Sequence, residues 1–388
     1  MNEHPKAASA ANKPPLIKSN VIFFIAINLL GFVVAPLYGW LVGFNTAAWV
    51  AFSVLWILSG LSITAGYHRL WSHRTYKASR PLQLLLALFG TFSLQNSILV
   101  WAARHRIHHR HVDEVDQDPH SIKSGFWHAH MGWMVRDWPT SKIDFDQVKD
   151  LQANPIVMFQ HRYYWPAVWL LNLGVPVVLG LVFGDILGMI LLASAFRLAF
   201  SQHCTFFINS LAHTWGKRNY SDENTARDNG LIALLTWGEG YHNFHHAFQA
   251  DYRNGLRWWQ FDPGKWLIAL SSWLGLAWDL RRTPRFKIQR ARLLMQFRQL
   301  RERLEAAEQG ADESVLTWRQ VVDREYQQFK ETVAQWQAVQ ADRVAAGADA
   351  LRDRWRKTEL RTRYKELEYR LKMQHRRLVM LQQAACAA

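Results

Sequence analysis

Cysteine is nearly absent from this chain of 388 residues, which contains only Cys204 and Cys386. They form no CxxC pair, so neither a disulfide framework nor thiolate-based chemistry is expected. Acidic side chains are also in the minority, because 31 Asp and Glu stand against 46 Lys and Arg and give a formal net charge of +15. That excess favours an anionic partner such as a phospholipid surface or a phosphorylated substrate. No nucleic-acid-binding motif is present, so we expect no nucleic-acid partner.

Charged side chains are missing, or nearly so, from four long apolar stretches, which are residues 20–44, 47–67, 165–183 and 186–209. Each is long enough to cross a bilayer as a helix, and the first is too long for the apolar core of a signal peptide. Only Gly184 and Asp185 join the last two stretches, which predicts an antiparallel pair of spans. The 20 tryptophans fit aromatic belts at the lipid headgroups. We therefore predict an all-α integral membrane protein with four transmembrane helices.

A fifth apolar stretch, residues 81–101, is interpreted as a helix that lies in the interface or re-enters from one side. If it crossed the bilayer, "HRLWSH" (68–73) and "HRIHH" (105–109) would lie on opposite faces. It also carries Ser93, Gln95, Asn96 and Ser97, which are unfavourable toward lipid.

Lysine and arginine are absent from the two short loops on the side opposite the termini. This bias predicts that both termini and the histidine-rich segments lie on the cytoplasmic side, and we expect a bacterial inner membrane.

The composition divides the chain into three predicted parts: a flexible polar N-terminus (1–19), a membrane domain (20–285) and a basic helical extension (286–388). The extension carries apolar residues at helical spacing, interrupted at Gly310 and Gly347, and is interpreted as a helical hairpin or coiled coil. Its basic face is explained either by solvated helices that pack on each other or by binding to anionic lipid headgroups.

Histidines gather in four short segments, each at the cytosolic mouth of an apolar stretch or just beyond it. These are "HRLWSH", "HRIHH", "NSLAH" and "HNFHH", which hold His68, His73, His105, His108, His109, His213, His242, His245 and His246. A single basic run such as "ARHRIHHRH" can also be a solvated face or a phosphate-binding patch. Four such segments are hard to explain without metal, because burying so many imidazoles without partners is expensive.

The number of histidines indicates two metal ions. Imidazole suits zinc, copper, iron and nickel, and nine histidines are too many for one ion. Two metals beside a membrane, without thiolates, point to redox or oxygen chemistry on an apolar substrate.

The segments "GYHRLWSHRTYKA", "HRIHH", "NSLAHTWG" and "GEGYHNFHHAF", with "DPH" at 118–120, resemble the motifs of the membrane acyl-CoA Δ9 fatty acid desaturases of the stearoyl-CoA type. The resemblance covers roughly residues 20–285. It implies a non-haem di-iron centre held by the nine histidines and, through a water, by Asn209. It assigns to one iron His68, His105, His109 and His246 with Asn209, and to the other His73, His108, His213, His242 and His245.

The same resemblance implies a reaction that uses O2 and two electrons. Hydrogen is removed from C9 and then C10 of a bound acyl chain, which leaves a cis double bond and water. Gln95, Asn96 and Trp101 match positions near the bend of the family's acyl tunnel.

Acyl-CoA carries phosphates, and four basic side chains at the cytosolic mouth are candidate contacts: Arg74, Arg104, Lys77 and Arg106. Asp116 and Asp118 are expected to orient ligand histidines.

Two positions depart from the family pattern and leave the acyl carrier open among CoA, acyl carrier protein and phospholipid. Phe206 stands where a tryptophan is common, and Arg104 stands where an acidic residue is common. No His-Pro-Gly-Gly motif of a fused cytochrome b5 is present, so we expect a separate reductase and a ferredoxin-, rubredoxin- or cytochrome b5-like carrier. The extension lies outside the resemblance, and donor docking, self-association and membrane contact stay open as its role.

Three other classes of protein fit the sequence less well than a desaturase does. A related membrane di-iron hydroxylase also uses histidine boxes, but the extended flanks favour the desaturase. A metal transporter or sensor is disfavoured because transporters place ligands near the membrane midplane, whereas these gather at one mouth. A non-catalytic coiled-coil interaction protein is disfavoured by the complete set of ligands.

Overall fold

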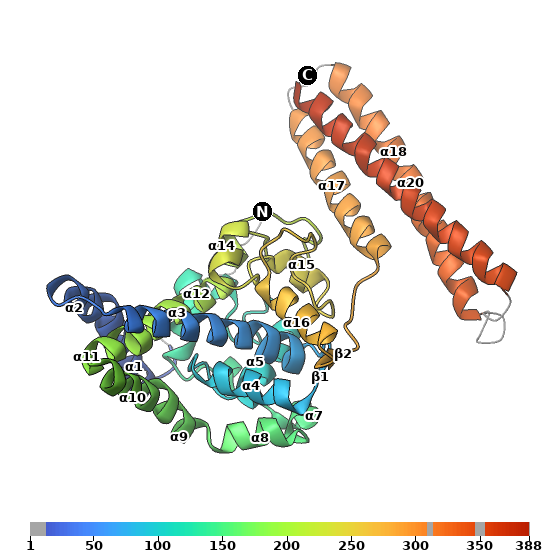
Figure 1. Cartoon of the computed structure of the whole chain (residues 1–388). Helices are drawn as coiled ribbons and strands as arrows, with labels where there is room; N and C mark the ends of the chain where they lie inside the picture. Colours follow the sequence, from blue (N-terminus) through green and yellow to red (C-terminus); the bar gives the residue numbers. More distant parts are fainter. Residues whose placement is uncertain (1–12, 309–312, 346–353, 388) are drawn as a thin grey trace. The chain divides into compact units, whose positions relative to one another are not determined.

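The computed structural model describes residues 13–308, 313–345 and 354–387 (Figure 1). Residues 1–12 of the expected polar N-terminus, and the expected helix breaks at Gly310 and Gly347, lie outside the described residues. The described part is mainly helical, and its only strands, β1 (Lys77–Ala78) and β2 (Ala277–Trp278), pair antiparallel. The all-α prediction is therefore confirmed.

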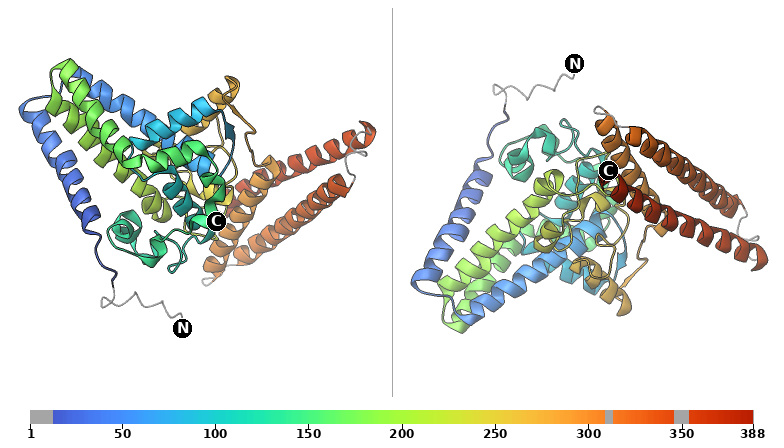
Figure 2. Two further views of the ribbon diagram at one scale, coloured as in Figure 1. Left: turned by 90° about the horizontal axis from the view of Figure 1, so that it is seen from below. Right: turned by 90° about the horizontal axis from the view of Figure 1, so that it is seen from above.

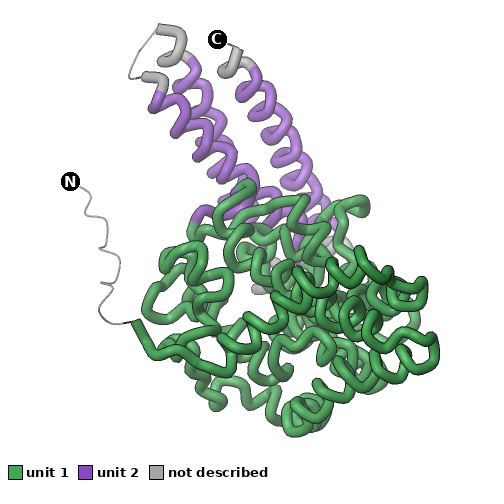
Figure 3. Tube along the Cα trace, turned by 90° about the vertical axis from the view of Figure 1, so that its left-hand side faces the viewer, with its two compact units in different colours: residues 1–217, 223–282 green, residues 218–222, 283–388 purple. Residues whose placement is uncertain are grey.

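The chain forms two compact units (Figure 3), which are described separately. Unit 1 comprises residues 1–217 and 223–282, and unit 2 comprises residues 218–222 and 283–388. The boundary expected from the sequence, after residue 285, lies three residues from the division after residue 282.

Four helices of unit 1 are long and apolar enough to cross a membrane, as predicted, and they run over Lys18–Leu41, Thr46–Ser72, Tyr164–Phe183 and Ile186–Thr214. The first, third and fourth contain α-helical segments joined through a π-helical turn, and the second ends in a π-helical segment. Their α-helical parts are α1 (Lys18–Leu29), α2 (Ala35–Leu41), α3 (Thr46–Leu61), α9 (Tyr164–Trp169), α10 (Val175–Phe183), α11 (Ile186–Met189), α12 (Arg197–Asn209) and α13 (Leu211–Thr214). The π-helical parts are η2 (Leu30–Val34), η3 (Ser62–Ser72), η8 (Leu170–Gly174) and η9 (Ile190–Phe196).

A tight turn joins the third and fourth spans, as the short link predicts. Gly184 has a φ of 76°, a left-handed conformation that glycine adopts without strain. Asp185 then caps α11 by accepting a hydrogen bond from the backbone N–H of Gly188.

The fourth span carries a charged side chain, Arg197, that is fully buried in protein. Its guanidinium donates to the carbonyl oxygens of Ala193 and Phe92, at 2.8 and 3.0 Å, and to the side chain of Asn172. A charge at membrane depth is tolerated because protein groups, rather than lipid, surround it.

The fifth apolar stretch is two helices, α4 (Arg80–Thr91) and α5 (Ile98–Arg110), rather than the single helix expected over 81–101. The chain turns between them at Leu94 and Asn96, which both have positive φ, and Ser97 then caps α5. The polar residues of "SLQNS" (93–97) are compatible with this turn, whereas an uninterrupted apolar sequence would have favoured one continuous helix. Neither helix is among the four that can cross the membrane, in agreement with the prediction.

Short helices complete unit 1 at the end where the histidine segments lie (Figure 1). They are α6 (Phe126–His130), α7 (Lys149–Gln152), α8 (Pro155–Arg162), α14 (Gly230–Leu235), α15 (His242–Ala247) and α16 (Pro263–Trp273). Short 3-10 turns also occur at Ile122–Ser124, Gly132–Met134, Pro139–Ser141 and Phe145–Val148.

Unit 2 consists mainly of three long helices, α17 (Arg285–Glu308), α18 (Glu313–Ala345) and α20 (Arg354–Ala387). Their apolar side chains form one buried cluster, in which the rings of Phe286 and Trp336 stack at 4.2 Å. Arg377 of α20 pairs with Glu325 of α18 at 2.9 Å. The apolar spacing in the sequence is thus explained by packing among these helices.

Candidate metal centre

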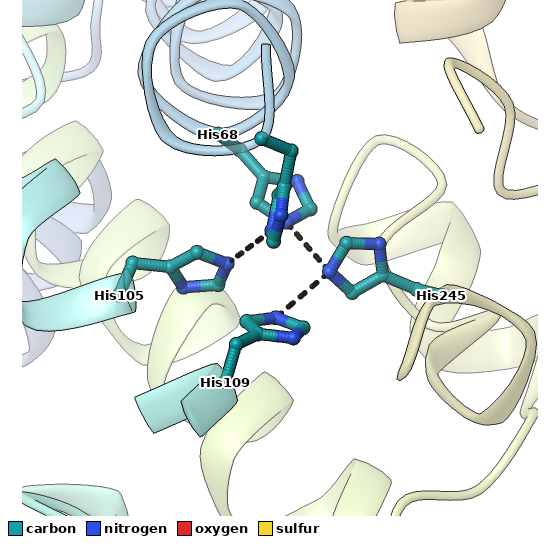
Figure 4. Close-up of side chains that lie close together, drawn as sticks. His68, His105, His109 and His245 are labelled. Carbon is teal, nitrogen blue, oxygen red and sulfur yellow. Dashed lines mark hydrogen bonds between the residues drawn. The ribbon is translucent and has the colours of Figure 1, made fainter. Parts of the chain in front are cut away.

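Five histidines converge in a first cluster, which we call cluster A: His68, His73, His105, His109 and His245. One ring nitrogen from each lies within 4.8 Å of all the others. They come from the end of the second span, from α5 and from α15. Figure 4 shows four of these rings turned toward a common space.

A π-helical turn brings the first pair of cluster A together. His68 and His73 are five residues apart, a spacing that places side chains on different faces of an α-helix. The backbone N–H of His73 instead donates to the carbonyl of His68 at 3.1 Å, a π-type bond, and the two ring centroids lie 4.8 Å apart. Such turns are frequent at functional sites.

Four further histidines form cluster B: His108, His213, His242 and His246. Their ring nitrogens also lie within 4.8 Å of one another. On α5 and α15, adjacent histidines point in different directions, so each helix contributes to both clusters. The sequence-derived set of nine histidines is therefore brought together in full.

The partition expected from the resemblance is wrong at three positions. His73 and His245 lie in cluster A, and His246 lies in cluster B, which is the reverse of the expected assignment. The π-helical turn explains His73, whose Nε2 lies 2.8 Å from that of His105. On α15, His245 faces His68 and His246 faces His242, with Nε2 separations of 2.9 and 3.0 Å.

Each cluster has one buried carboxylate that contacts a histidine ring. In cluster A, Glu239 lies 2.9 Å from Nδ1 of His68 and also pairs with Arg69. In cluster B, Asp118 lies 2.9 Å from Nδ1 of His108. Such partners fix the ring orientation and leave Nε2 free for a metal.

The sequence predicted the role of Asp118 but not that of Glu239, and the expectation for Asp116 is wrong because Asp116 is exposed. Glu239 stands three residues before His242 in "GEGYHNFHH", so an acidic residue within a histidine motif was the available signal. A third carboxylate, Asp113, was also missed. It binds the hydroxyl of Thr225, which lies 2.7 Å from Nδ1 of His213.

The electrostatics favour neutral imidazoles and charged carboxylates. Burial, followed by the neighbouring histidines, holds the pKa well below its ordinary value for six cluster histidines outside the spans: His73, His105, His109, His242, His245 and His246. Burial alone would raise the pKa of Glu239, but His68 and Arg69 outweigh it and hold that pKa well below its usual range. The neutral imidazole is the form that binds metals.

The donor set fits metal ions better than it fits an internal hydrogen-bond network. Among the described residues, Nε2 of His108 is buried and has no hydrogen-bond partner. Elsewhere Nε2 faces Nε2, at 2.9 Å between His68 and His245 and at 3.0 Å between His245 and His109. One Nε2 can donate to only one such neighbour, whereas a cation accepts the lone pairs of all of them.

A cavity of about 850 Å³ adjoins both clusters. His68, His105, His108 and His242 line it, and so does Asn209, the residue expected to act through a water. Asn209 ends α12 and is not a member of either cluster.

Four of the five expected substrate contacts also line this cavity: Gln95, Asn96, Trp101 and Arg104. The side chain of Gln95 accepts from the indole of Trp101 and donates to Thr205, at 3.2 and 2.9 Å, which fixes its position. The guanidinium of Arg104 lies 5.7 Å from the ring centre of Trp133, and burial lowers its pKa.

Arg74 is not among the described residues that line the cavity, and its expected contact with the substrate stays a prediction. Its exposed side chain lies 3.8 Å from Asp150. Arg106 is also engaged elsewhere, because it pairs with Asp150 at 2.8 Å. Lys77 pairs with Asp279 at 2.8 Å.

The fold and the site together define an integral membrane protein that carries two histidine clusters, suited to metal ions, at one end of its spans. Residues 38–270 match the family described as "Fatty acid desaturase", which is more than half of the chain. The chain therefore belongs to the fatty acid desaturase family.

Three relatives illustrate the similarity. "Probable acyl-CoA desaturase" of Schizosaccharomyces pombe is 46% identical over 238 residues, 61% of this chain and 50% of the relative. "Acyl-CoA desaturase 1" of Saccharomyces cerevisiae is 44% identical over 243 residues, 62% and 47% of the two chains. "Acyl-CoA Delta(11) desaturase" of Spodoptera littoralis is 34% identical over 277 residues, 68% and 80% of the two chains.

The chain thus spans about half the length of the two yeast relatives. All three relatives are eukaryotic, so they give no support to the expected bacterial inner membrane.

Proposed function

We propose that this protein is a membrane acyl desaturase that converts a saturated fatty acyl chain, carried as acyl-CoA, into the cis-9 monounsaturated product. One observation carries the proposal: two all-histidine clusters adjoin a cavity that continues from them between membrane-spanning helices. The names of the relatives support an acyl-CoA substrate. One relative is named as a Δ11 enzyme, so the position of the double bond is tested separately.

We propose two non-haem iron ions as the cofactors, one held by cluster A and one by cluster B, with Asn209 contributing through a water. Imidazole nitrogen suits iron, and iron bound there would supply the activation of O2. The residues of the chain supply the rest: Glu239 and Asp118 fix ligand rings, and the apolar cavity excludes water. Gln95, held by Trp101 and Thr205, positions the acyl chain beside the clusters.

Arg104 is proposed to bind a phosphate of the acyl carrier. It lines the cavity, and Nε of its guanidinium is buried without a hydrogen-bond partner among the described residues. Phe206 lines the same cavity and cannot donate a hydrogen bond to a thioester carbonyl. The choice among CoA, acyl carrier protein and phospholipid is therefore an outcome of the test below.

Two further proposals concern the orientation of the protein in the membrane and its source of electrons. We propose that the histidine clusters and both termini face the cytoplasm, because the loops at the opposite end carry no Lys or Arg. Electrons are proposed to come from a separate carrier and reductase. Most apolar side chains of α17, α18 and α20 are buried within unit 2, so self-association or donor docking would use mainly their charged faces. Sedimentation of the purified protein with and without residues 286–388 tests self-association.

The test is the fatty-acid profile of a desaturase-deficient host that expresses the chain. We expect new cis-9 monounsaturated acids, lost in the double variant His105→Ala, His109→Ala. The matched control is His111→Ala, because His111 follows the same helix but pairs with Glu114 outside both clusters.

Each alternative has its own result. Hydroxy acids would identify a membrane hydroxylase, and a double bond at another carbon would correct the regiochemistry. Purified protein with acyl-CoA, acyl carrier protein and phospholipid substrates separates the carriers. Absence of any product, with iron bound and electrons supplied, would refute the proposal.

A further inference from the structure

The cavity beside the histidine clusters continues along the membrane spans. Its walls include Phe23 and Ile27 of the first span, and Trp169 and Leu173 of the third span. Several wall residues also face outward: Ile22 is 66% exposed and Trp169 is 66% exposed. The cavity therefore reaches the outer, lipid-facing surface of these two spans.

The opening lies at the same depth on both helices. Ile27 is nine residues beyond Lys18, where the first span begins, and Leu173 is nine residues beyond Tyr164, where the third span begins. At a rise of about 1.5 Å per residue, both positions lie about 13 Å along their helices. That distance is within half of the ~30 Å hydrocarbon core, so these wall residues lie in the first half of each span. Figure 2 shows α1 diverging from the other spans toward its N-terminal end.

The fourth span forms the back wall of this groove, from Asn209 at the clusters to Ser194. Two polar side chains along it, those of Ser194 and Gln202, already donate hydrogen bonds within the protein. Ser194 donates to the carbonyl of Asn172 at 2.5 Å, and Gln202 donates to that of Leu94 at 3.4 Å. An apolar guest would therefore leave these two side chains paired.

We propose that this groove, between α1 and the α9–η8 segment, is a lateral portal through which a single fatty acyl chain passes between the bilayer and the clusters. In a bilayer, lipid would surround the outer sides of Ile22 and Trp169. On their inner sides the groove is continuous with the cavity at Asn209. The volume of about 850 Å³ lies within the range of about 300–1,000 Å³ that is usual for ligand pockets. The role of the portal in delivery or release rests on the proposed function, but its occupation by lipid does not.

The test uses the full-length protein in lipid nanodiscs that contain a phospholipid with a diazirine in the middle of its acyl chain. After illumination, peptide mass spectrometry locates the adducts. Leu198 is the decisive position, because it lines the groove on the fourth span and is only 4% exposed. Ile25 and Leu170 are internal references, since they lie on the same two spans, are exposed, and do not line the groove.

We expect adducts on Leu198 as well as on both reference residues. A non-reactive stearoyl-CoA analogue should remove the Leu198 adduct and leave the reference adducts unchanged. Leu173→Trp, which fills the opening, should also abolish the Leu198 adduct, whereas the matched control Leu170→Trp should preserve it. Labelling of Ile25 and Leu170 without Leu198 would overturn the portal.

This readout is independent of turnover. Leu198 adducts in a protein that forms no desaturated product would sustain the portal and refute the proposed function. Desaturated product without Leu198 adducts would support the proposed function and refute the portal.

Discussion

Replacing Glu239 with glutamine should disable cluster A without touching a histidine. Glu239 is 5% exposed, and its carboxylate contacts Nδ1 of His68, the guanidinium of Arg69, the amide of Asn254 and the hydroxyl of Thr64. An amide keeps the size of the side chain but loses its charge. Its NH2 group would also meet groups that themselves donate, which leaves at least one buried donor unpaired.

The magnitude follows from the partners that remain. Breaking a buried ion pair by removing one partner costs about 3–5 kcal/mol. Arg69 keeps a second carboxylate, Asp262, at 2.8 Å, so we expect the lower end of that range, about 3 kcal/mol. Loss of the group that orients His68 should also reduce metal affinity or activity by about 10–100-fold.

The assay measures bound iron, the free energy of unfolding in detergent, and turnover on the same preparations. The control is Asp279→Asn, which removes an exposed pair with Lys77 and should cost at most about 1 kcal/mol. If Glu239→Gln binds iron and unfolds like Asp279→Asn, the assigned role of Glu239 is wrong.

Three further predictions concern the cavity, the spans and pH. Arg104→Gln should raise KM for acyl-CoA about 10–100-fold, because one charged hydrogen bond to the substrate is lost. Arg74→Gln should leave KM unchanged, and steady-state kinetics compares the two variants. Gly31→Ala should cost about 1–3 kcal/mol in detergent unfolding, because its Cβ would lie 2.6 Å from that of Ala199, while Gly230→Ala, which meets nothing within 4 Å, should be tolerated. Because the pKa of the cluster histidines outside the spans is lowered, the unfolded chain binds more protons than the folded chain does. The free energy of unfolding of the metal-free protein should therefore be highest above about pH 6.5 and fall below it, which unfolding across a pH series measures. Unchanged KM in the first, equal stability in the second, or a flat pH profile in the third would each contradict the reasoning.

The sequence predicted the spans and the nine histidines because both signals are local. A membrane span is predicted from one continuous stretch without charge, and the histidines are recognised from four short motifs that each contain one or more of them. The partition of the ligands was not accessible in this way. It depends on a π-helical turn between His68 and His73 and on how α15 is rotated, since His245 and His246 are neighbours that serve different clusters.

The missed carboxylates have the same physical origin. Glu239 acts on His68, which is 171 residues away in the sequence, and no periodicity links them. Asp118 was found because it lies only 10 residues from His108. The break between α4 and α5 was missed because it requires positive φ at Leu94, which does not mark a turn as glycine would, and because Asn96, which does tolerate positive φ, was interpreted only as a polar residue.

The length of the second span explains how a membrane helix can build a polar metal site. Thr46–Ser72 contains 27 residues, about 40 Å of helix, against a hydrocarbon core of about 30 Å. The excess places His68 and Arg69 beyond the hydrocarbon core, where the carboxylates of Glu239 and Asp262 contact them. Arg69 binds Asp262 at the start of α16, and Gly264 lies so close to Thr64 that a Cβ there would approach it to 3.0 Å. The end of the span, α16 and cluster A are therefore one packed assembly, so the position of this helix in the bilayer and the geometry of the histidines are set together.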